Sequence, residues 1–318
     1  TDSAAASMVR RPRDRATPER AGVGVIRSDN PVLPQPVAAD QDPSIEQVED
    51  MVRAAVDAAG GLGQVLGSQA RMVAVKPNLV EVKRSGDGTV TDWRVVRAVA
   101  RLVHQIAPQA RVKVIESCNW DEPGNESRRE DGWGYAGYTA LQEEPYVDLV
   151  NLNYGRTVSR SVPGGGVARA AYPYPALMDS VDCLIDVPVV KVIGIVHMTA
   201  AMKNLVGMLP DDGSTSRFAV LDHSPSVLDQ GIVDLNLLHP VDFVVADALV
   251  GLERAKTTSW GGRPVRLNTI LASADVVAAD AVAARLIGLS PEAIEYLVLG
   301  QRLGLGVADS ARIEVRGE

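Results

Sequence analysis

Cysteine is scarce in this 318-residue chain, which contains only Cys118 and Cys183. Two thiols are too few for the four thiolates that usually hold an iron–sulfur cluster, and too few for a disulfide framework. We therefore expect no iron–sulfur cluster, and reduced thiols in a cytoplasmic protein, with a single disulfide left open. Cys118 follows a predicted strand close to Glu116, which makes it a candidate nucleophile, although free buried cysteines are commonly inert.

The chain also has no excess of basic residues and no long apolar run. Its 40 acidic and 32 basic residues give a net charge of −8, which argues against a general binder of nucleic acids or anionic membranes. No run approaches the ~18 apolar residues of a membrane span. The early RRPRDR segment is not followed by the apolar stretch of a secretory signal. Small molecules are therefore the expected partners, and a homo-oligomer stays open.

What the chain does have is the composition of an ordinary globular protein, with 46% hydrophobic and 23% charged residues. Residues 1–20 are rich in Ala, Ser, Arg and Pro, a composition that predicts a disordered tail. Residues 21–318 are long enough to bury a substantial core, either as one α/β region or as two lobes.

Strands alternate with helices along this region. Extended runs are predicted at 23–28, 72–78 and 111–117, and around residues 146, 181 and 241; helical spacing is found at 45–60, 91–107, 199–206 and, as two helices, 274–300. Ser44, Thr91 or Asp92, and Thr199 are the expected caps at three of the helix starts. The alternation predicts a mostly parallel, doubly wound α/β sheet, with a cleft between two lobes.

Polar residues follow three of the predicted strands. Lys76 and Asn78 close the second strand, Glu116 closes the third, and Lys191 follows a buried apolar run. Because open α/β sheets bind ligands beyond the carboxyl ends of their strands, these side chains are predicted to meet at one site.

The segment KVIGIVHMTAAMKNLVGMLP, residues 191–210, carries the most polar chemistry inside an apolar run. On a helix from Thr199, the side chains of Thr199 and Lys203 share one flank, and His197 and Asn204 share the other. A Thr199 cap would place His197 beside helix N–H groups that attract anions. The segment therefore predicts a carboxylate or phosphate site with His197, Lys203 and Thr199 as catalytic residues. The alternative is a hydrogen-bonded structural histidine and a Lys203 that reaches solvent.

Further candidates lie in the following segments. Arg217 and His223 belong to a polar stretch that either folds over a ligand or is a solvated connection. Asp247 and Glu253 follow a strand, and they suit general bases or hard-metal ligands, or else a turn and a solvent-exposed side chain. Together with His197 and His223, these two acidic residues could form a mixed site for a divalent metal, but no short HxH or HxxxH spacing supports one.

Several of these segments, taken together, resemble a known family. VAVKPNLV, the TD before the second helix, VIES, PVVKVIGIVHMTAAMKNLVGMLP, DLN at 234–236, VVADALVGLE and ILASADVVAADAVAARLIG occur in that order from about residue 22 onward. Their combination is similar to the bacterial and archaeal family called domain of unknown function 362 (DUF362). Family members often carry a ferredoxin-like iron–sulfur module. This chain lacks the cysteines for such a module, so the resemblance does not imply electron transfer by a bound cluster here.

A weaker similarity concerns the nickel-dependent lactate racemase superfamily. Its pattern of histidine, small residue and lysine before a Gly/Pro turn resembles His197, Thr199, Lys203, Gly207 and Pro210. The resemblance implies a two-domain α/β enzyme with proton or hydride chemistry beside a carboxylate, and it does not establish nickel use.

The sequence therefore predicts a metabolic or biosynthetic enzyme of isomerase, lyase or cyclase type. His197 would be the acid or base, with Lys203 and Thr199 beside it. Substrate binding is assigned to Lys76, Asn78, Glu116, Lys191, Asn204, Arg217 and His223. The rival hypotheses are a non-catalytic or electron-transfer accessory protein and a redox enzyme with a dissociable cofactor.

Overall fold

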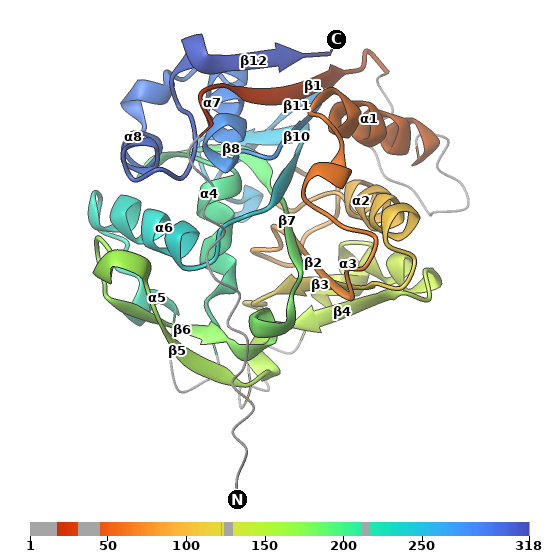
Figure 1. The fold of residues 1–318 in the computed structure, drawn as a ribbon, viewed down its shortest axis with the longest axis horizontal. Helices are drawn as coiled ribbons and strands as arrows, with labels where there is room; N and C mark the ends of the chain where they lie inside the picture. Colours follow the sequence, from red (N-terminus) through yellow and green to blue (C-terminus); the bar gives the residue numbers. More distant parts are fainter. Residues whose placement is uncertain (1–17, 31–44, 122, 124–129, 212–216, 318) are drawn as a thin grey trace, which may run out of the picture.

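The computed structural model describes residues 18–30, 45–121, 123, 130–211 and 217–317, and one large sheet runs through them (Figure 1). Its strands are β1 (Ala21–Arg27), β2 (Met72–Pro77), β3 (Arg111–Glu116), β4 (Val147–Asn151), β7 (Cys183–Val187), β8 (Val189–Ile193), β9 (His197–Thr199), β10 (Phe243–Glu253), β11 (Arg263–Ser273) and β12 (Ile313–Arg316). The sheet order is β12-β1-β11-β10-β7-β2-β3-β4, and β8 joins it through β10 and carries β9. A separate antiparallel pair consists of β5 (Thr157–Ser161) and β6 (Ala171–Pro175).

Most strand pairs in the large sheet are parallel, as predicted. Strands β10, β7, β2, β3 and β4 form a continuous parallel block, and β1 and β12 are also parallel. β11 is antiparallel to both of its neighbours, β1 and β10. The predicted strand around residue 181 is in fact two strands, because Pro188 separates β7 from β8. The predicted mostly parallel α/β fold is therefore confirmed.

Helices cover both faces of the sheet. They are α1 (Ile45–Ala58), α2 (Trp93–Ile106), α3 (Gly132–Tyr135), α4 (Ala201–Asn204), α5 (Arg217–Val220), α6 (Val227–Leu238), α7 (Val276–Leu286) and α8 (Glu295–Arg302). One apolar core joins α1 and α2 to one face of the sheet, and a second core joins α4, α6, α7 and α8 to the other face (Figure 1). In the described ranges, no helix has both the length and the apolar character needed to span a bilayer.

Alternation along β2 divides its side chains between the two cores. Val73 and Val75 belong to the core under α1 and α2, whereas Ala74 belongs to the core under α4 and α7. The Asp92 carboxylate caps α2 by accepting a hydrogen bond from the N–H of Arg94, which confirms the second of the two predicted caps there. Ser44, the expected cap of α1, lies outside the described residues.

The segment after β8 corrects the predicted helix from Thr199. Residues 197–199 form β9, an antiparallel partner of β8, in which Thr199 lies opposite Lys191. His197 takes a positive φ of 65°, a conformation that a helix excludes. Helix α4 begins at Ala201, and its N-cap residue Ala200 makes no side-chain cap. Thr199 is therefore not the cap, because tight hairpin pairing with β8 takes precedence over helical spacing.

The N-terminus of α4 is capped from another helix. The buried Asp280 of α7 accepts hydrogen bonds from the N–H groups of Ala201, at 2.6 Å, and Met202, at 3.0 Å. These are the donors that the sequence assigned to an anionic ligand. An internal carboxylate satisfies them instead, and it complements the positive end of the helix dipole.

Asp280 is expected to make the stability of the protein depend on pH. Burial raises its pKa from the ordinary value of 3.8 to about 7, so between these values the unfolded chain binds fewer protons than the folded one. The free energy of unfolding therefore falls as pH rises through this window, by up to about 1.4 kcal/mol per pH unit. Urea unfolding of Asp280→Asn should show a shallower pH slope than the wild type, whereas the exposed Asp57→Asn should keep the wild-type slope. Equal slopes for both variants would refute the assignment.

Candidate active site

A buried polar cluster joins the carboxyl ends of β2 and β3 to helix α4. The fully buried Lys76 donates from Nζ to Glu116 Oε2 at 2.9 Å and to the carbonyl of Pro77 at 2.7 Å. The second oxygen of Glu116 accepts the N–H of Ser117 at 3.0 Å, and Oε2 also accepts the N–H of Leu79. A Cβ at position 207 would lie 2.8 Å from Lys76 Nζ, so glycine at this position leaves room for the pair.

Asn204 connects this pair to a further buried carboxyl group. Its Nδ2 donates to Asp186 Oδ1 at 2.7 Å and to the carbonyl of Lys76 at 3.1 Å, while its Oδ1 lies 3.5 Å from Lys76 Nζ. Asp186 is fully buried and its Oδ2 has no partner among the described residues. Burial, only partly offset by Lys76, raises the pKa of Asp186 well above its usual range. Burial thus favours the neutral form of Asp186.

A second buried lysine, Lys191, lies in the middle of β8. Lys191 donates from Nζ to Asn78 Oδ1 at 2.5 Å and to the carbonyl of Thr89 at 2.6 Å. Both acceptors are uncharged, so desolvation is not balanced by a carboxylate in direct contact. Burial, together with the charges of Lys203 and Lys256, lowers the pKa of Lys191 to about 7.

Four basic side chains from four segments influence one another here, and we call them the cationic cluster: Lys191, Lys203, Arg217 and Lys256. Burial and Lys256 lower the pKa of Lys203 to about 8, and burial and Arg217 lower the pKa of Lys256. Lys203 is partly buried and makes no hydrogen bond or ion pair with the described residues. Like charges gathered in a desolvated space favour a bound anion.

Arg217 and His223 extend this cluster. Arg217 is buried and donates to the carbonyl of Ser117 at 2.5 Å and to its hydroxyl at 2.9 Å, so it reaches the end of β3. The half-buried His223 has its Nδ1 2.8 Å from the carbonyl oxygen of Leu221. Burial, Lys203 and Lys256 together lower its pKa. His223 therefore belongs to the same electrostatic environment as the lysines.

His197 lies elsewhere on the hairpin. Its side chain is exposed, and the ionisable group that it influences electrostatically is Asp229 of α6, whose pKa is raised chiefly by burial. Thr199 is buried opposite Lys191. The structure thus joins Lys76 to Glu116 and Asn204, and Lys191 to Asn78, by direct contacts. Lys203 and Arg217 belong to the cationic cluster, and His223 lies in its electrostatic influence. No recorded contact joins His197 to either group in the described part of the chain.

The family model for the domain of unknown function DUF362 matches residues 73–285 of this chain. The chain belongs to the DUF362 family. The matched residues include β3, β8 and α4 and nearly all of β2 and α7, and thus both polar clusters of the site. No curated protein matches this DUF362 chain.

A solved structure shares the fold of this DUF362 protein. It is the lactate racemase apoprotein from Thermoanaerobacterium thermosaccharolyticum, with a TM-score of 0.50 and 12% sequence identity. The match covers 76% of the present chain and 55% of the racemase chain. The DUF362 protein therefore spans about half the length of that enzyme, and the likeness establishes the fold alone.

The residues suggested as metal ligands do not come together. Asp247 is buried and accepts the N–H groups of Asp92 and Leu249, while Glu253 pairs with Arg263 at 2.5 Å. Across the described ranges, no three His, Cys, Asp or Glu side chains are arranged to hold a metal ion. Within these ranges, His197, His223, Asp247 and Glu253 therefore do not form a metal centre with one another.

Three functional features were not predicted. Lys256 follows β10 and stacks over Trp260 at 4.3 Å from the ring centroid, and no pattern in the sequence marked it. Asp186 and Asp280 each stand alone in an apolar segment, LIDVPVV and VVAADAVAA, and a lone carboxylate in such a run is a signal for a paired or neutral buried acid.

Cys118, the candidate nucleophile, is buried and forms no disulfide. Burial and Glu116 raise the pKa of its thiol, which disfavours the reactive thiolate.

Proposed function

We propose that this DUF362 protein is a small-molecule enzyme that binds an anionic substrate, a carboxylate or phosphate, and performs acid–base chemistry of isomerase, lyase or cyclase type. The observation that carries the proposal is the cationic cluster at the carboxyl ends of the parallel strands. This is the edge at which open α/β folds bind ligands. The shared fold with a lactate racemase, which by its name acts on a small hydroxy acid, supports the same class.

In this proposal, Lys191, Lys256 and Arg217 hold the charge of the substrate. Lys203 moves the proton, since a group whose pKa lies at about 8 is suited to both accept and release a proton near neutral pH. The buried Lys76–Glu116 pair, with Asn204 and Asp186, fixes α4 and therefore the position of Lys203. His223 is placed to contact the same anion. His197 stays a candidate from the sequence alone.

Proton exchange into substrate is the direct test. The protein would be incubated in D2O with a panel of hydroxy acids, dicarboxylates and phosphorylated metabolites, and deuterium incorporation followed by proton NMR. We expect one member to exchange or convert, and Lys203→Gln to lower the rate by about 10²-fold or more. Lys83→Gln, at a partly exposed lysine paired with Glu81, is the matched control.

The same assay distinguishes Lys203 from His197 as the residue that transfers the proton. If Lys203 is the proton carrier, His197→Gln keeps most of the activity; if the sequence prediction holds, His197→Gln abolishes turnover while leaving substrate affinity intact. Failure of the wild type to bind any anion of the panel, together with the absence of exchange, would sink the proposed function.

A further inference from the structure

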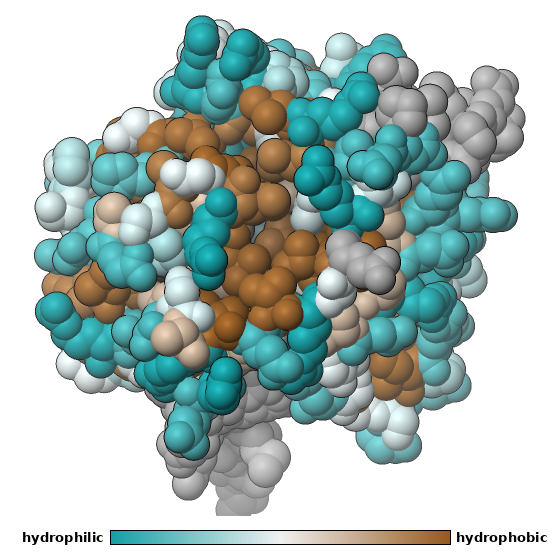
Figure 2. Space-filling model, turned by 90° about the horizontal axis from the view of Figure 1, so that it is seen from above, coloured by the Kyte–Doolittle hydropathy of each residue, from teal (hydrophilic) through white to brown (hydrophobic). Residues whose placement is uncertain are grey.

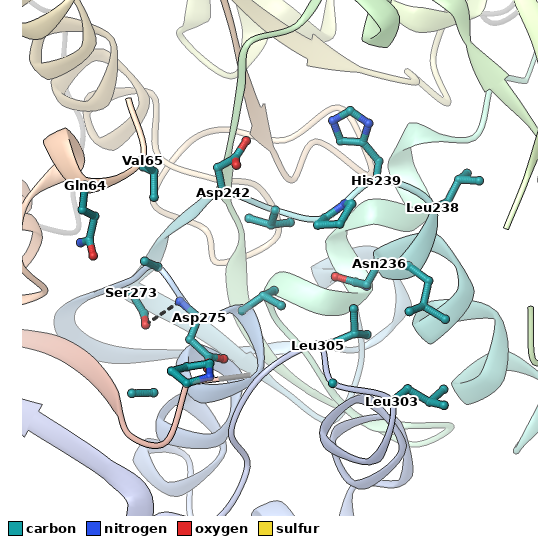
Figure 3. A pocket seen from close by; sticks show the side chains of 18 of the residues that line it. Gln64, Val65, Asn236, Leu238, His239, Asp242, Ser273, Asp275, Leu303 and Leu305 are labelled. Atoms are coloured by element: carbon teal, nitrogen blue, oxygen red, sulfur yellow. Dashed lines mark hydrogen bonds between the residues drawn. The ribbon is translucent and has the colours of Figure 1, made fainter. Parts of the chain in front are cut away.

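A cavity lies at the amino end of the parallel strand β10, away from the cationic cluster. Apolar side chains gather around a central hollow on the face that β12 and β1 occupy at the top of Figure 1 (Figure 2). A cavity of about 610 Å³ is lined by the end of α6, the loop before β10, the turn from β11 to α7 and the segment after α8 (Figure 3). Its volume is typical of sites for small molecules. No member of the cationic cluster lines it.

Asn236 of α6 presents an unsatisfied acceptor to this cavity. Its Nδ2 donates to the carbonyls of Met202, at 2.9 Å, and Ile232, at 2.8 Å. Because both partners are acceptors, the orientation of the amide is fixed and Oδ1 is its free end. Asn236 is fully buried, and Oδ1 has no partner among the described residues. Figure 3 shows this oxygen directed into the space between the lining side chains.

The polar groups of the lining near Asn236 and the turn after β11 are mostly acceptors, and the basic Arg160 at another part of the wall is paired with Asp179. Ser273 Oγ donates to the carbonyl of Gly22 and accepts the N–H of Asp275, so its proton is already used. The buried carboxylates of Asp242 and Asp275 accept backbone N–H groups. Gln64 donates from Nε2 to the carbonyls of Ala59 and Gly61. A ligand that brings a donor to this part of the cavity would therefore be favoured.

Several apolar side chains in the cavity wall favour an apolar ligand. Leu238, Val241 and Val276 are buried around the cavity, and Leu305 lies partly buried at its edge. We propose that this cavity binds an uncharged, mainly apolar small molecule whose hydroxyl or N–H group donates to Asn236 Oδ1. Such a donor would remove the cost of leaving a buried carbonyl without a partner. The inference is independent of the function proposed for the cationic cluster.

Indole and indene test this proposal, because they share a shape and differ in the N–H donor. Binding to the full-length protein would be measured by ligand-observed NMR titration. We expect indole to bind about tenfold more tightly than indene. Asn236→Leu should remove that difference. Equal affinities of the two probes for the wild type would overturn the proposal and leave Asn236 facing a buried water.

A second variant locates the binding without touching Asn236. Leu305→Trp fills the cavity from its edge and should abolish binding of both probes. Val315→Trp, at an exposed position of β12, should bind indole as the wild type does. Indole affinity that is unchanged in Leu305→Trp would place the probe elsewhere and refute the cavity as its site.

Discussion

Replacement of Lys76 by methionine is expected to lower the free energy of unfolding by about 3–5 kcal/mol, because it leaves a buried carboxylate without its cation. Lys76 and Glu116 are both almost inaccessible to solvent, with exposed side-chain fractions of 0% and 3%. Methionine replaces the aliphatic part of the lysine side chain but supplies none of the hydrogen bonds that reach Glu116 and the carbonyl of Pro77. The loss would be measured by urea unfolding at neutral pH.

Two further variants make the result specific to the buried pair. Lys83→Met removes a lysine whose ion pair with Glu81 is partly exposed and long, at 3.9 Å, and should cost less than about 1 kcal/mol. The double variant Lys76→Met/Glu116→Gln should recover part of the loss, because the remaining buried group is no longer charged. If Lys76→Met costs no more than Lys83→Met, the pair does not hold the site together.

The affinity of the cationic cluster for anions is expected to fall steeply with rising pH. Lys191 and Lys203 have pKa values lowered to about 7 and about 8, in each case chiefly by burial. A bound anion favours their ammonium forms and raises both values. Binding above about pH 7 therefore takes up protons, and each lysine that must be protonated weakens the affinity by up to about tenfold per pH unit above its pKa.

Sulfate is a suitable probe because its charge does not change in this range. Calorimetric titrations in two buffers of different ionisation enthalpy would count the protons taken up at pH 8, and the dissociation constant would be followed from pH 7 upward. Lys203→Gln should remove the contribution with the higher pKa, whereas Lys83→Gln should leave the wild-type profile. A dissociation constant independent of pH would contradict the assignment of these two lysines.

The lowered pKa values of Lys191 and Lys203 also determine whether the free energy of unfolding rises or falls with pH. The unfolded lysines keep their ordinary pKa of 10.5, so between about pH 7 and that value the unfolded chain binds more protons than the folded one. These two lysines therefore make the anion-free protein more stable as pH rises through this window. This is opposite to the effect of Asp280 at lower pH.

Much of the site could be predicted because the rule that places it is topological. Lys76, Asn78, Glu116 and Lys191 each follow a strand that the alternation of apolar residues revealed, and parallel strands bring their carboxyl ends to one edge. The cap at Asp92 and the division of the C-terminal helices at Gly288, where φ is +79°, rest on equally local signals.

The parts of the fold and of the site that the sequence did not predict depend on contacts between residues far apart in the chain. The spacing of Met198, Met202 and Leu205 fitted a helix, yet pairing with β8 made residues 197–199 a strand. The donors at the start of α4 seemed free until the fold brought Asp280 to them across 79 residues. Lys256 entered the cationic cluster through the path of the chain after β10, which no local pattern encodes.

The pairing of β1 with β11 and β12 has a consequence for synthesis on the ribosome. β1 is the first strand described, but its hydrogen-bonding neighbours are residues 263–273 and 313–316. During translation β1 must wait, unpaired, until β11 has emerged, and its other edge stays open until β12 follows, while the block of β2, β3 and β4 can already form. The order of emergence thus separates an early-folding parallel block from a late-closing edge, and a pause before β11 would leave that edge exposed to aggregation.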